Sequence, residues 1–448
     1  MAAEAWRLTL SEGLRRLSEG SLTASDWVRA LLGRIDSCEG RVRAWVHVDR
    51  EGALAAAKAV EGSRAGKPPL AGAPVAFKDI IDVQGMLREA NSPLYKGYVP
   101  RKDAAAAARL RAAGAILLGK TVTTQFATSD PAETFNPWNP AYSPGGSSSG
   151  SAAAVAAGMV PAALGSQTGG SVLRPSAFCG VVGFKPTYGR IPRTGMVPVS
   201  WTLDHVGIIA RSAEDAARLL TALAGPDAGD DASLDAPAAD YASASAPRRP
   251  ARVCFLREDF LPRASREVAE WTERAAARLK ERGAAVEEGR LPVDFDLLHA
   301  AHRVIMRVEA AAYHGRMFRE NMDAYLPEIR HNISGGLMVP AVHYAQALRL
   351  RARLARETQR LLERYELVLS PSMVEAPPVR EKSTGNALFQ EPLTQSGLPA
   401  ITLPLGRGEG NLPIGVQLGA GRLKEAELLG VARWCEAELG WRSEIAPL

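Results

Sequence analysis

Two glycine–serine clusters, at residues 145–151 and 165–171, lie within a single stretch of the chain that runs from 143 to 186. Glycines let backbone N–H groups converge on one anionic atom, and serines add hydroxyl groups at the same place. A flexible linker would not contain the Ala–Val segment between the clusters or the apolar run from Phe178 to Phe184. A phosphate-binding P-loop is disfavoured as well, because no Lys stands before Ser171. The stretch therefore predicts a functional site inside an ordered fold.

Strand and helix patterns alternate on the N-terminal side of this stretch. Apolar runs at 74–83 and 115–119 predict buried strands, and a helix pattern at 104–113 lies between them. Such alternation is typical of an α/β sheet with helices on its faces. Ligands of these sheets bind beyond the carboxyl ends of the strands, so we expect the site at that edge.

Chains of 448 residues commonly form two or three domains, but large α/β enzymes of this length also fold as one unit. Helical spacing of Trp27, Leu31 and Ile35 predicts helices near the N-terminus. The stretch 226–250 is acidic, Pro-rich and aperiodic, which predicts a surface loop. We therefore expect one domain over residues 1–448, divided into a helical N-terminal segment (1–65), a core with the glycine–serine clusters (66–225), the surface loop (226–250) and a second half with long amphipathic helices (251–448).

Charge and cysteine content argue against several classes of protein. The net charge of +5 is a slight excess of 54 basic over 49 acidic residues, which gives no reason to expect a nucleic acid partner. The 4 cysteines are far apart, so neither a disulfide framework nor a zinc site is indicated. No signal peptide and no apolar run of about 18 residues is recognisable. We expect a cytoplasmic protein without a membrane partner.

Ser171 is the candidate nucleophile, because acyl transfer needs a hydroxyl and hydrogen-bond donors aimed at the developing oxyanion. Thr168, Gly169 and Gly170 precede it, and the two glycines tolerate unusual backbone angles that would point N–H groups to one spot. One turn would then supply both the nucleophile and the oxyanion hole.

A serine nucleophile also needs a base, and no histidine of this sequence is a compelling one. His205 follows Asp204, but neighbouring residues of an extended segment point to opposite faces, so this Asp is badly placed to orient that His. His299 and His302 share one helical face, and without a third ligand we interpret them as surface or satisfied core residues.

A buried lysine is the alternative base, because burial disfavours the ammonium and lowers the pKa. Three lysines, Lys78, Lys120 and Lys185, have apolar neighbours in the sequence. Their sequence surroundings alone do not choose among the three.

Four segments together resemble the amidase signature family of serine hydrolases: PVAFKDIIDV at 74–83, GGSSSGSAAAVAAG at 145–158, GSQTGGSVLRPSAFCGVVGFKPTYGR at 165–190 and LPIGVQLGAG at 412–421. The resemblance implies a central mixed sheet covered by helices on both faces. It also implies Lys78 as the base and Ser147 as the bridge to the nucleophile. The remaining features that it implies are an oxyanion hole from the N–H groups of Thr168, Gly169, Gly170 and Ser171, and a cis peptide bond at Gly146–Ser147.

The chain departs from the family pattern next to the nucleophile. The family usually has Asp four residues before it and Arg two residues after it, where this chain has Gln167 and Leu173, with Arg174 one step further on. Losing both members of an ion pair need not destabilise a protein, whereas losing one would. We interpret the chain as a variant, still active, member of the family.

The resemblance implies hydrolysis of a carboxamide through an acyl-enzyme on Ser171, with release of ammonia or an amine. Two alternatives are the amidase (glutaminase) subunit of a glutamine-dependent tRNA amidotransferase and a non-catalytic scaffold of the same fold. We expect a small-molecule amide as substrate and neither metal nor organic cofactor, and a homodimer is left open.

Residues of the second half should supply the substrate pocket. Arg307, Glu309, Tyr313 and His314 share one predicted helix, and Trp201 lies near the site in sequence. We select Trp201 and Arg307 as the candidate substrate-binding residues.

Overall fold

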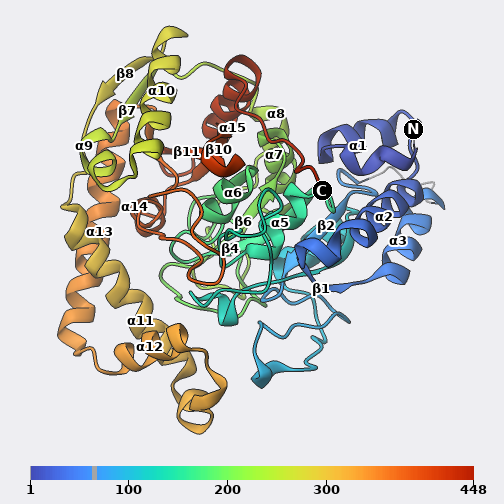
Figure 1. Cartoon of the computed structure of the whole chain (residues 1–448), viewed down its shortest axis with the longest axis horizontal. Coiled ribbons are helices and arrows are strands. Elements are labelled where there is room, and N and C mark those ends of the chain that lie inside the picture. Colours follow the sequence, from blue (N-terminus) through green and yellow to red (C-terminus); the bar gives the residue numbers. More distant parts are fainter. Residues whose placement is uncertain (1, 63–67) are drawn as a thin grey trace.

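The computed structural model describes residues 2–62 and 68–448, and its centre is one mixed sheet of eleven strands (Figure 1). The strand order is β1–β3–β2–β4–β6–β5–β10–β11–β9–β7–β8. Parallel pairing joins β2 to β3 and β4, and β7 to β8 and β9, whereas the other neighbours are antiparallel. The strands are β1 (Trp45–Val48), β2 (Pro74–Lys78), β3 (Ile116–Thr121), β4 (Ala162–Gln167), β5 (Val182–Lys185), β6 (His205–Ala210), β7 (Arg252–Phe255), β8 (Ala285–Glu288), β9 (Leu367–Pro371), β10 (Ala400–Arg407) and β11 (Pro413–Ala420).

Both faces of this sheet are buried, because alternate residues of a strand enter different apolar clusters. In β2, Val75 and Phe77 pack in one cluster and Ala76 packs in another. Successive side chains of a strand point to opposite faces, so the two clusters lie on the two sides of the sheet. Helices α1 (Leu10–Ser18), α4 (Ala105–Ala112), α7 (Ala213–Leu223) and α15 (Glu425–Trp434) contribute to the first, and α2 (Ala24–Val42), α3 (Arg50–Gly62) and α5 (Ser149–Ala156) contribute to the second. The expected single α/β domain with a mixed sheet is confirmed.

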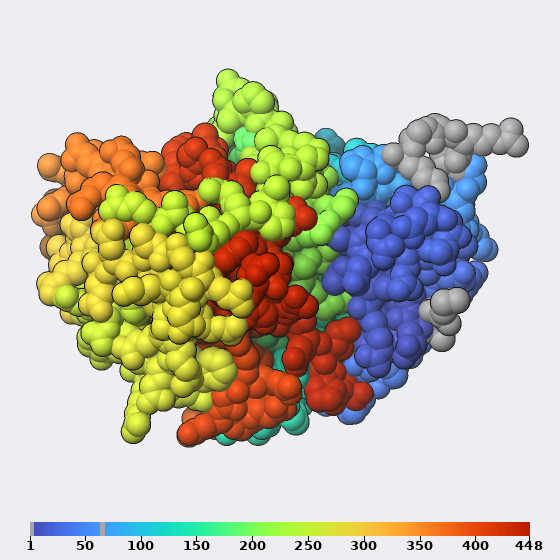
Figure 2. Space-filling model, turned by 90° about the horizontal axis from the view of Figure 1, so that it is seen from above, coloured from blue at the N-terminus to red at the C-terminus, as the bar shows by residue number. Residues whose placement is uncertain are grey.

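The second half of the chain covers the other end of the sheet. Figure 2 shows the N-terminal residues (blue) and residues of the second half of the chain (yellow and orange) at opposite ends of the molecule, with residues near the C-terminus (red) between them. The remaining helices are α6 (Leu173–Cys179), α8 (Tyr241–Ala244), α9 (Arg257–Phe260), α10 (Arg266–Glu281), α11 (Phe295–Glu320), α12 (Pro327–Leu337), α13 (Ala341–Arg364) and α14 (Glu391–Gln395). Within the described residues, none of the helices has both the length and the apolar character that crossing a membrane requires.

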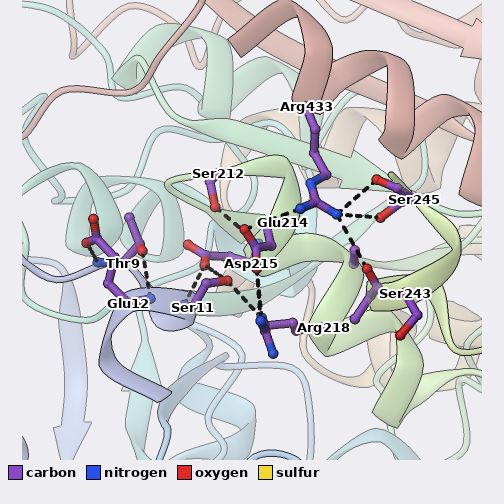
Figure 3. Close-up of polar contacts among 12 residues, drawn as sticks. Thr9, Ser11, Glu12, Ser212, Glu214, Asp215, Arg218, Ser243, Ser245 and Arg433 are labelled. Atoms are coloured by element: carbon purple, nitrogen blue, oxygen red, sulfur yellow. Dashed lines mark hydrogen bonds and ion pairs between the residues drawn. The ribbon is translucent and has the colours of Figure 1, made fainter. Parts of the chain in front are cut away.

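Polar contacts join the first helix to elements of the middle and the end of the chain (Figure 3). Ser212 begins α7 by accepting a hydrogen bond from the Asp215 N–H at 3.1 Å. The Asp215 carboxylate accepts from the N–H and the hydroxyl of Ser11 at 2.8 and 2.7 Å. Arg433 of α15 lies 3.5 Å from Glu214, which belongs to α7. These contacts fasten α1 and α15 to α7.

Two segments differ from the expectation. The segment 1–65 is not wholly helical, because Trp45–Val48 forms β1 and pairs with β3 at one edge of the sheet. The stretch 226–250 is not a simple surface loop, since Tyr241 begins α8 and is 4% exposed. Arg190 donates to the Tyr241 hydroxyl and to two carbonyls of this stretch, which anchors it to the core. The expected boundary at 65/66 lies outside the described residues.

Candidate active site

Three segments meet at the carboxyl end of β2. Strands β2 and β4 are parallel neighbours, so Lys78 at the end of one lies beside the turn that follows the other. The residues just before α5 lie against that turn, because the Ser148 N–H donates to the Ser171 carbonyl at 3.3 Å. The Ser148 hydroxyl also accepts from the Ser166 N–H at 3.3 Å. The two glycine–serine clusters are therefore adjacent in space, as expected.

The structure distinguishes the three candidate lysines by their partners. The Lys78 amine is fully buried and donates to the hydroxyls of Ser147 at 2.7 Å and Ser166 at 2.9 Å. Lys120 lies 3.2 Å from the Asp79 carboxylate, and the charge of Asp79 opposes the lowering of the Lys120 pKa by burial. Lys185 donates to backbone carbonyls. Only Lys78 of these three contacts hydroxyl groups of the glycine–serine clusters.

Burial lowers the pKa of the Lys78 amine well below its ordinary value, and the nearby Asp204 carboxylate opposes this shift. A buried ammonium loses hydration that its neighbours do not replace, so the neutral form is favoured. A neutral amine has a free electron pair, and the short contact with Ser147 then lets that hydroxyl donate to the amine. Lys78 thus has the properties of a general base.

The peptide bond between Gly146 and Ser147 is cis, as the resemblance implies. Arg174 of α6 donates to the Gly146 carbonyl at 2.7 Å. The preceding Gly145 has φ of +80°, and a Cβ there would lie 2.7 Å from the Cα of Pro175. The start of α6 therefore holds the backbone that presents Ser147, and Arg174 acts on this backbone.

The turn from Thr168 to Ser171 lines a cavity of about 560 Å³. Within the described part of the chain, no hydrogen bond uses the N–H groups of Gly169, Gly170 or Ser171. Neither glycine has a positive φ, so the unusual backbone angles expected for them are wrong. Close packing requires the second glycine, because a Cβ on Gly170 would lie 2.5 Å from the Gln390 side-chain oxygen.

No described hydrogen bond joins the hydroxyls of Ser147 and Ser171. Both side chains belong to segments held together by backbone contacts, and Ser171 is 8% exposed on the cavity wall. Contacts between reacting groups are often long before substrate binds and shorten in the substrate complex.

Gln167 holds the turn in place of an acid. Its side-chain oxygen accepts from the N–H groups of Val172 and Leu173, both at 2.9 Å, and its amide nitrogen donates to Thr394 at 2.9 Å. Thr394 in turn donates to the Gly169 carbonyl at 2.7 Å. A neutral amide thus provides the acceptor that this turn requires, without a charge that would need a buried partner.

The histidines fall into two groups. His205 and Asp204 form no triad with Ser171, because Asp204 accepts from Thr168 at 2.6 Å and from two backbone N–H groups. Burial raises the pKa of Asp204 to about 6. His299 and His302, in contrast, both line the cavity, and only for His302 is the interpretation as a surface or satisfied core residue wrong. His299 contacts Glu391 at 2.6 Å, whereas His302 is 1% exposed and neither of its ring nitrogens has a partner.

Of the expected pocket residues, Arg307 lines the cavity and Trp201 is not among the lining residues. Trp201 is 48% exposed and lies edge-on to Tyr313. Glu309 instead accepts from Thr202 and Tyr344, and His314 contacts Tyr325. The helical spacing of these residues could not show which face of α11 borders the cavity.

Sequence reasoning missed Ser166, the second hydroxyl partner of Lys78, and the cavity residue Arg303. A single serine inside a strand has no pattern that marks it, since its contact with Lys78 arises across neighbouring strands. A buried lysine in contact with the hydroxyls of Ser147 and Ser166, beside a turn whose N–H groups make no described hydrogen bond, is an arrangement suited to a serine hydrolase.

Comparisons with known proteins agree with this class. The family model described as Amidase matches residues 26–429. A curated relative, a glutamyl-tRNA(Gln) amidotransferase subunit from Roseiflexus sp. (strain RS-1), is 35% identical over 99% of this chain and 98% of its own length. The chain belongs to the amidase family.

Solved structures of the same fold include enzymes with different substrates. A chain from a vestigial protein complex that reveals the evolutionary origins of an s-triazine catabolic enzyme superposes with a TM-score of 0.90, at 28% identity over 98% of this chain and 100% of that one. The native peptide amidase from Stenotrophomonas maltophilia superposes with a TM-score of 0.86, at 28% identity over 98% of this chain and 99% of that one.

Proposed function

We propose that the protein hydrolyses a carboxamide C–N bond through an acyl-enzyme on Ser171, with Ser147 and Lys78 as the proton relay. The observation that carries this proposal is the buried Lys78 amine, 2.7 Å from the Ser147 hydroxyl, beside a cavity-lining turn in which three N–H groups make no described hydrogen bond. Membership of the amidase family supports the same reaction.

The steps follow from these positions. The Ser171 hydroxyl attacks the amide carbonyl, its proton passes to Ser147, and the Ser147 proton passes to neutral Lys78. The oxyanion is held by the N–H groups of the turn from Thr168 to Ser171. The C–N bond breaks as the relay returns a proton to the leaving nitrogen, and water then cleaves the ester on Ser171 by the same route. The products are a carboxylate and ammonia or an amine.

A fluorophosphonate label and a panel of primary amides test this proposal. We expect wild type to be labelled and to hydrolyse at least one amide, and Ser171→Ala to lose labelling. Ser171→Ala and Lys78→Met should each lower kcat by at least about 10³-fold. Full turnover in Ser171→Ala would refute the mechanism, and a wild type that is neither labelled nor active would favour the non-catalytic scaffold.

A second candidate is the glutaminase subunit of a tRNA amidotransferase, which the names of the curated relatives favour over a free-standing amidase. Against it stand Gln167 and Leu173, where the family pattern has Asp and Arg. Copurification from the native cell and glutaminase assays separate the two functions. A stable partner that raises glutaminase activity would support the role in an amidotransferase, whereas a chain that hydrolyses amides at full rate alone would support the amidase.

The cytoplasmic location stays a prediction, and so does the absence of a nucleic acid partner for a free-standing amidase. A glutaminase role in a tRNA amidotransferase would make tRNA an indirect partner. The homodimer also remains to be tested.

A further inference from the structure

One face of α11 forms a wall of the cavity next to the oxyanion turn. His299, His302, Arg303 and Arg307 all lie on this wall, and Arg303 and Arg307 are one helical turn apart. Side chains at this spacing lie side by side on a helix, so two guanidinium groups are near each other. Arg174 and Lys382, from other parts of the chain, also line the cavity and add positive charge.

Within the described residues, no carboxylate lies within ion-pair distance of Arg174, Arg303, Arg307 or Lys382. Arg307 donates to the Asn332 side-chain oxygen at 3.0 Å, and this partner is neutral. Burial, and then the charge of Arg303, lowers the pKa of Arg307, while the charge of Glu328 opposes this shift. Neighbouring cations of this kind are stabilised when an anion binds between them.

The acidic residues of the cavity do not cancel this charge. Glu391 is engaged by His299 at 2.6 Å. Glu328 and Glu375 are exposed, as are Arg303 and Lys382, so charges of both signs lie near the mouth, whereas Arg174 is buried and Arg307 is half-buried. The interior of the cavity is therefore more positive than its mouth.

His302 gives an independent indication that a polar ligand occupies this place. Its ring is buried, neither nitrogen has a hydrogen-bond partner among the residues that the structure describes, and its Nε2 would lie 3.5 Å from a Cβ on Gly169. Burial lowers the pKa of His302, so the ring is neutral and presents one donor and one acceptor. Buried polar groups are rarely left unpaired, and this one lies between the oxyanion turn and the two arginines.

We propose that the substrate is a small amide whose acyl part ends in a carboxylate, which Arg303 and Arg307 bind while the amide carbonyl lies in the oxyanion turn. This inference rests on the proposed function, because it assigns the substrate class of the same site. A neutral amide of the same length leaves both guanidinium groups unpaired. An amide with an additional ammonium group, such as glutamine, places a cation in the positive interior.

The test uses three amides of matched length: glutaramate, pentanamide and glutamine. Calorimetry measures the affinity of each amide for the Ser171→Ala variant without turnover, so it tests the inference separately from the proposed function. We expect glutaramate to bind at least about 10-fold more tightly than pentanamide and more tightly than glutamine, because hydrogen bonds to charged groups contribute about 1.5–3 kcal/mol. Adding Arg307→Gln should weaken glutaramate binding about 10- to 100-fold and leave pentanamide within about 3-fold.

Arg316→Gln is the matched control, because Arg316 lies on the same helix, pairs with Glu320 and is 87% exposed away from the cavity. We expect it to change neither ligand's affinity. Equal binding of glutaramate and pentanamide, or an equal loss of both in Arg307→Gln, would overturn the inference. If wild type hydrolyses pentanamide without preference for glutaramate, the inference is overturned and the amidase proposal stays intact. If wild type shows neither labelling nor turnover, the amidase proposal alone is overturned.

Discussion

Lys78, the proposed base, owes its properties to its surroundings. The side chain is fully buried at the end of β2, and the two hydroxyls that it contacts are neutral. Asp204 is the charged group that favours the ammonium, yet burial is the larger influence and lowers the pKa. The structure thus maintains an amine that is costly to protonate, and this cost must be visible in the stability of the fold.

The stability of wild type relative to Lys78→Met should depend on pH. The unfolded chain protonates this lysine with its ordinary pKa of 10.5, whereas the folded chain has a lower pKa. Between the two values the unfolded state binds more protons, so the free energy of unfolding rises with pH. Urea unfolding from pH 7 to pH 10 should show wild type gaining stability relative to Lys78→Met. Parallel curves would mean that Lys78 titrates normally.

The turn between β4 and α6 shows how one element presents a nucleophile. Gln167 ends β4, and its side-chain oxygen accepts from the N–H groups of Val172 and Leu173 at the start of α6. Residues 168–171 are therefore fixed at both ends. The carbonyl of Gly169 accepts a hydrogen bond from Thr394, which also fixes the middle of the turn. The turn is therefore rigid before substrate arrives, as oxyanion stabilisation requires.

Gln167→Met should loosen this turn. The substitution keeps the volume but leaves two buried N–H groups without an acceptor, which costs about 1–3 kcal/mol for each group. We expect the free energy of unfolding to fall by about 2–5 kcal/mol and kcat to fall more than KM rises. Gln167→Glu, which retains an acceptor oxygen, is the control and should keep more activity. Equal effects of the two variants would show that the acceptor is not what matters.

The sequence allowed the order of strands and helices around the glycine–serine clusters to be predicted, because apolar runs and caps are local signals. It did not reveal β1 or α6, which have four and seven residues and are too short for a period to appear. The choice of Lys78 over Lys120 depended on the family resemblance. The partners that distinguish the two lysines, the Ser147 hydroxyl for Lys78 and the Asp79 carboxylate for Lys120, come close to them only in the folded chain. His302 was misinterpreted for the same reason.

The whole molecule is organised by one uninterrupted sheet. Strands β5 and β10 are neighbours, so the sheet passes without a gap from the first half of the chain to the second. A single apolar cluster contains residues from Ala5 to Trp441. The halves therefore share their core and should depend on each other for stability.

Calorimetry should detect one unfolding transition with equal calorimetric and van't Hoff enthalpies. The reason is that neither half can bury its strands alone, since β5 and β10 would each become an exposed sheet edge. Trp441→Ala is a useful probe, because this buried side chain belongs to the shared cluster; it should lower stability by about 3–5 kcal/mol without splitting the transition. Two resolved transitions would indicate halves that fold independently.

The lysine and the serines around it all come from residues 78–171, whereas α11, which begins at Phe295, contributes only a wall of the cavity. Mutations that accumulate on that helix can therefore alter which molecules are admitted while the machinery for breaking bonds is inherited unchanged. Because the two sets of residues are separate, single substitutions on α11 can change the substrate range during evolution.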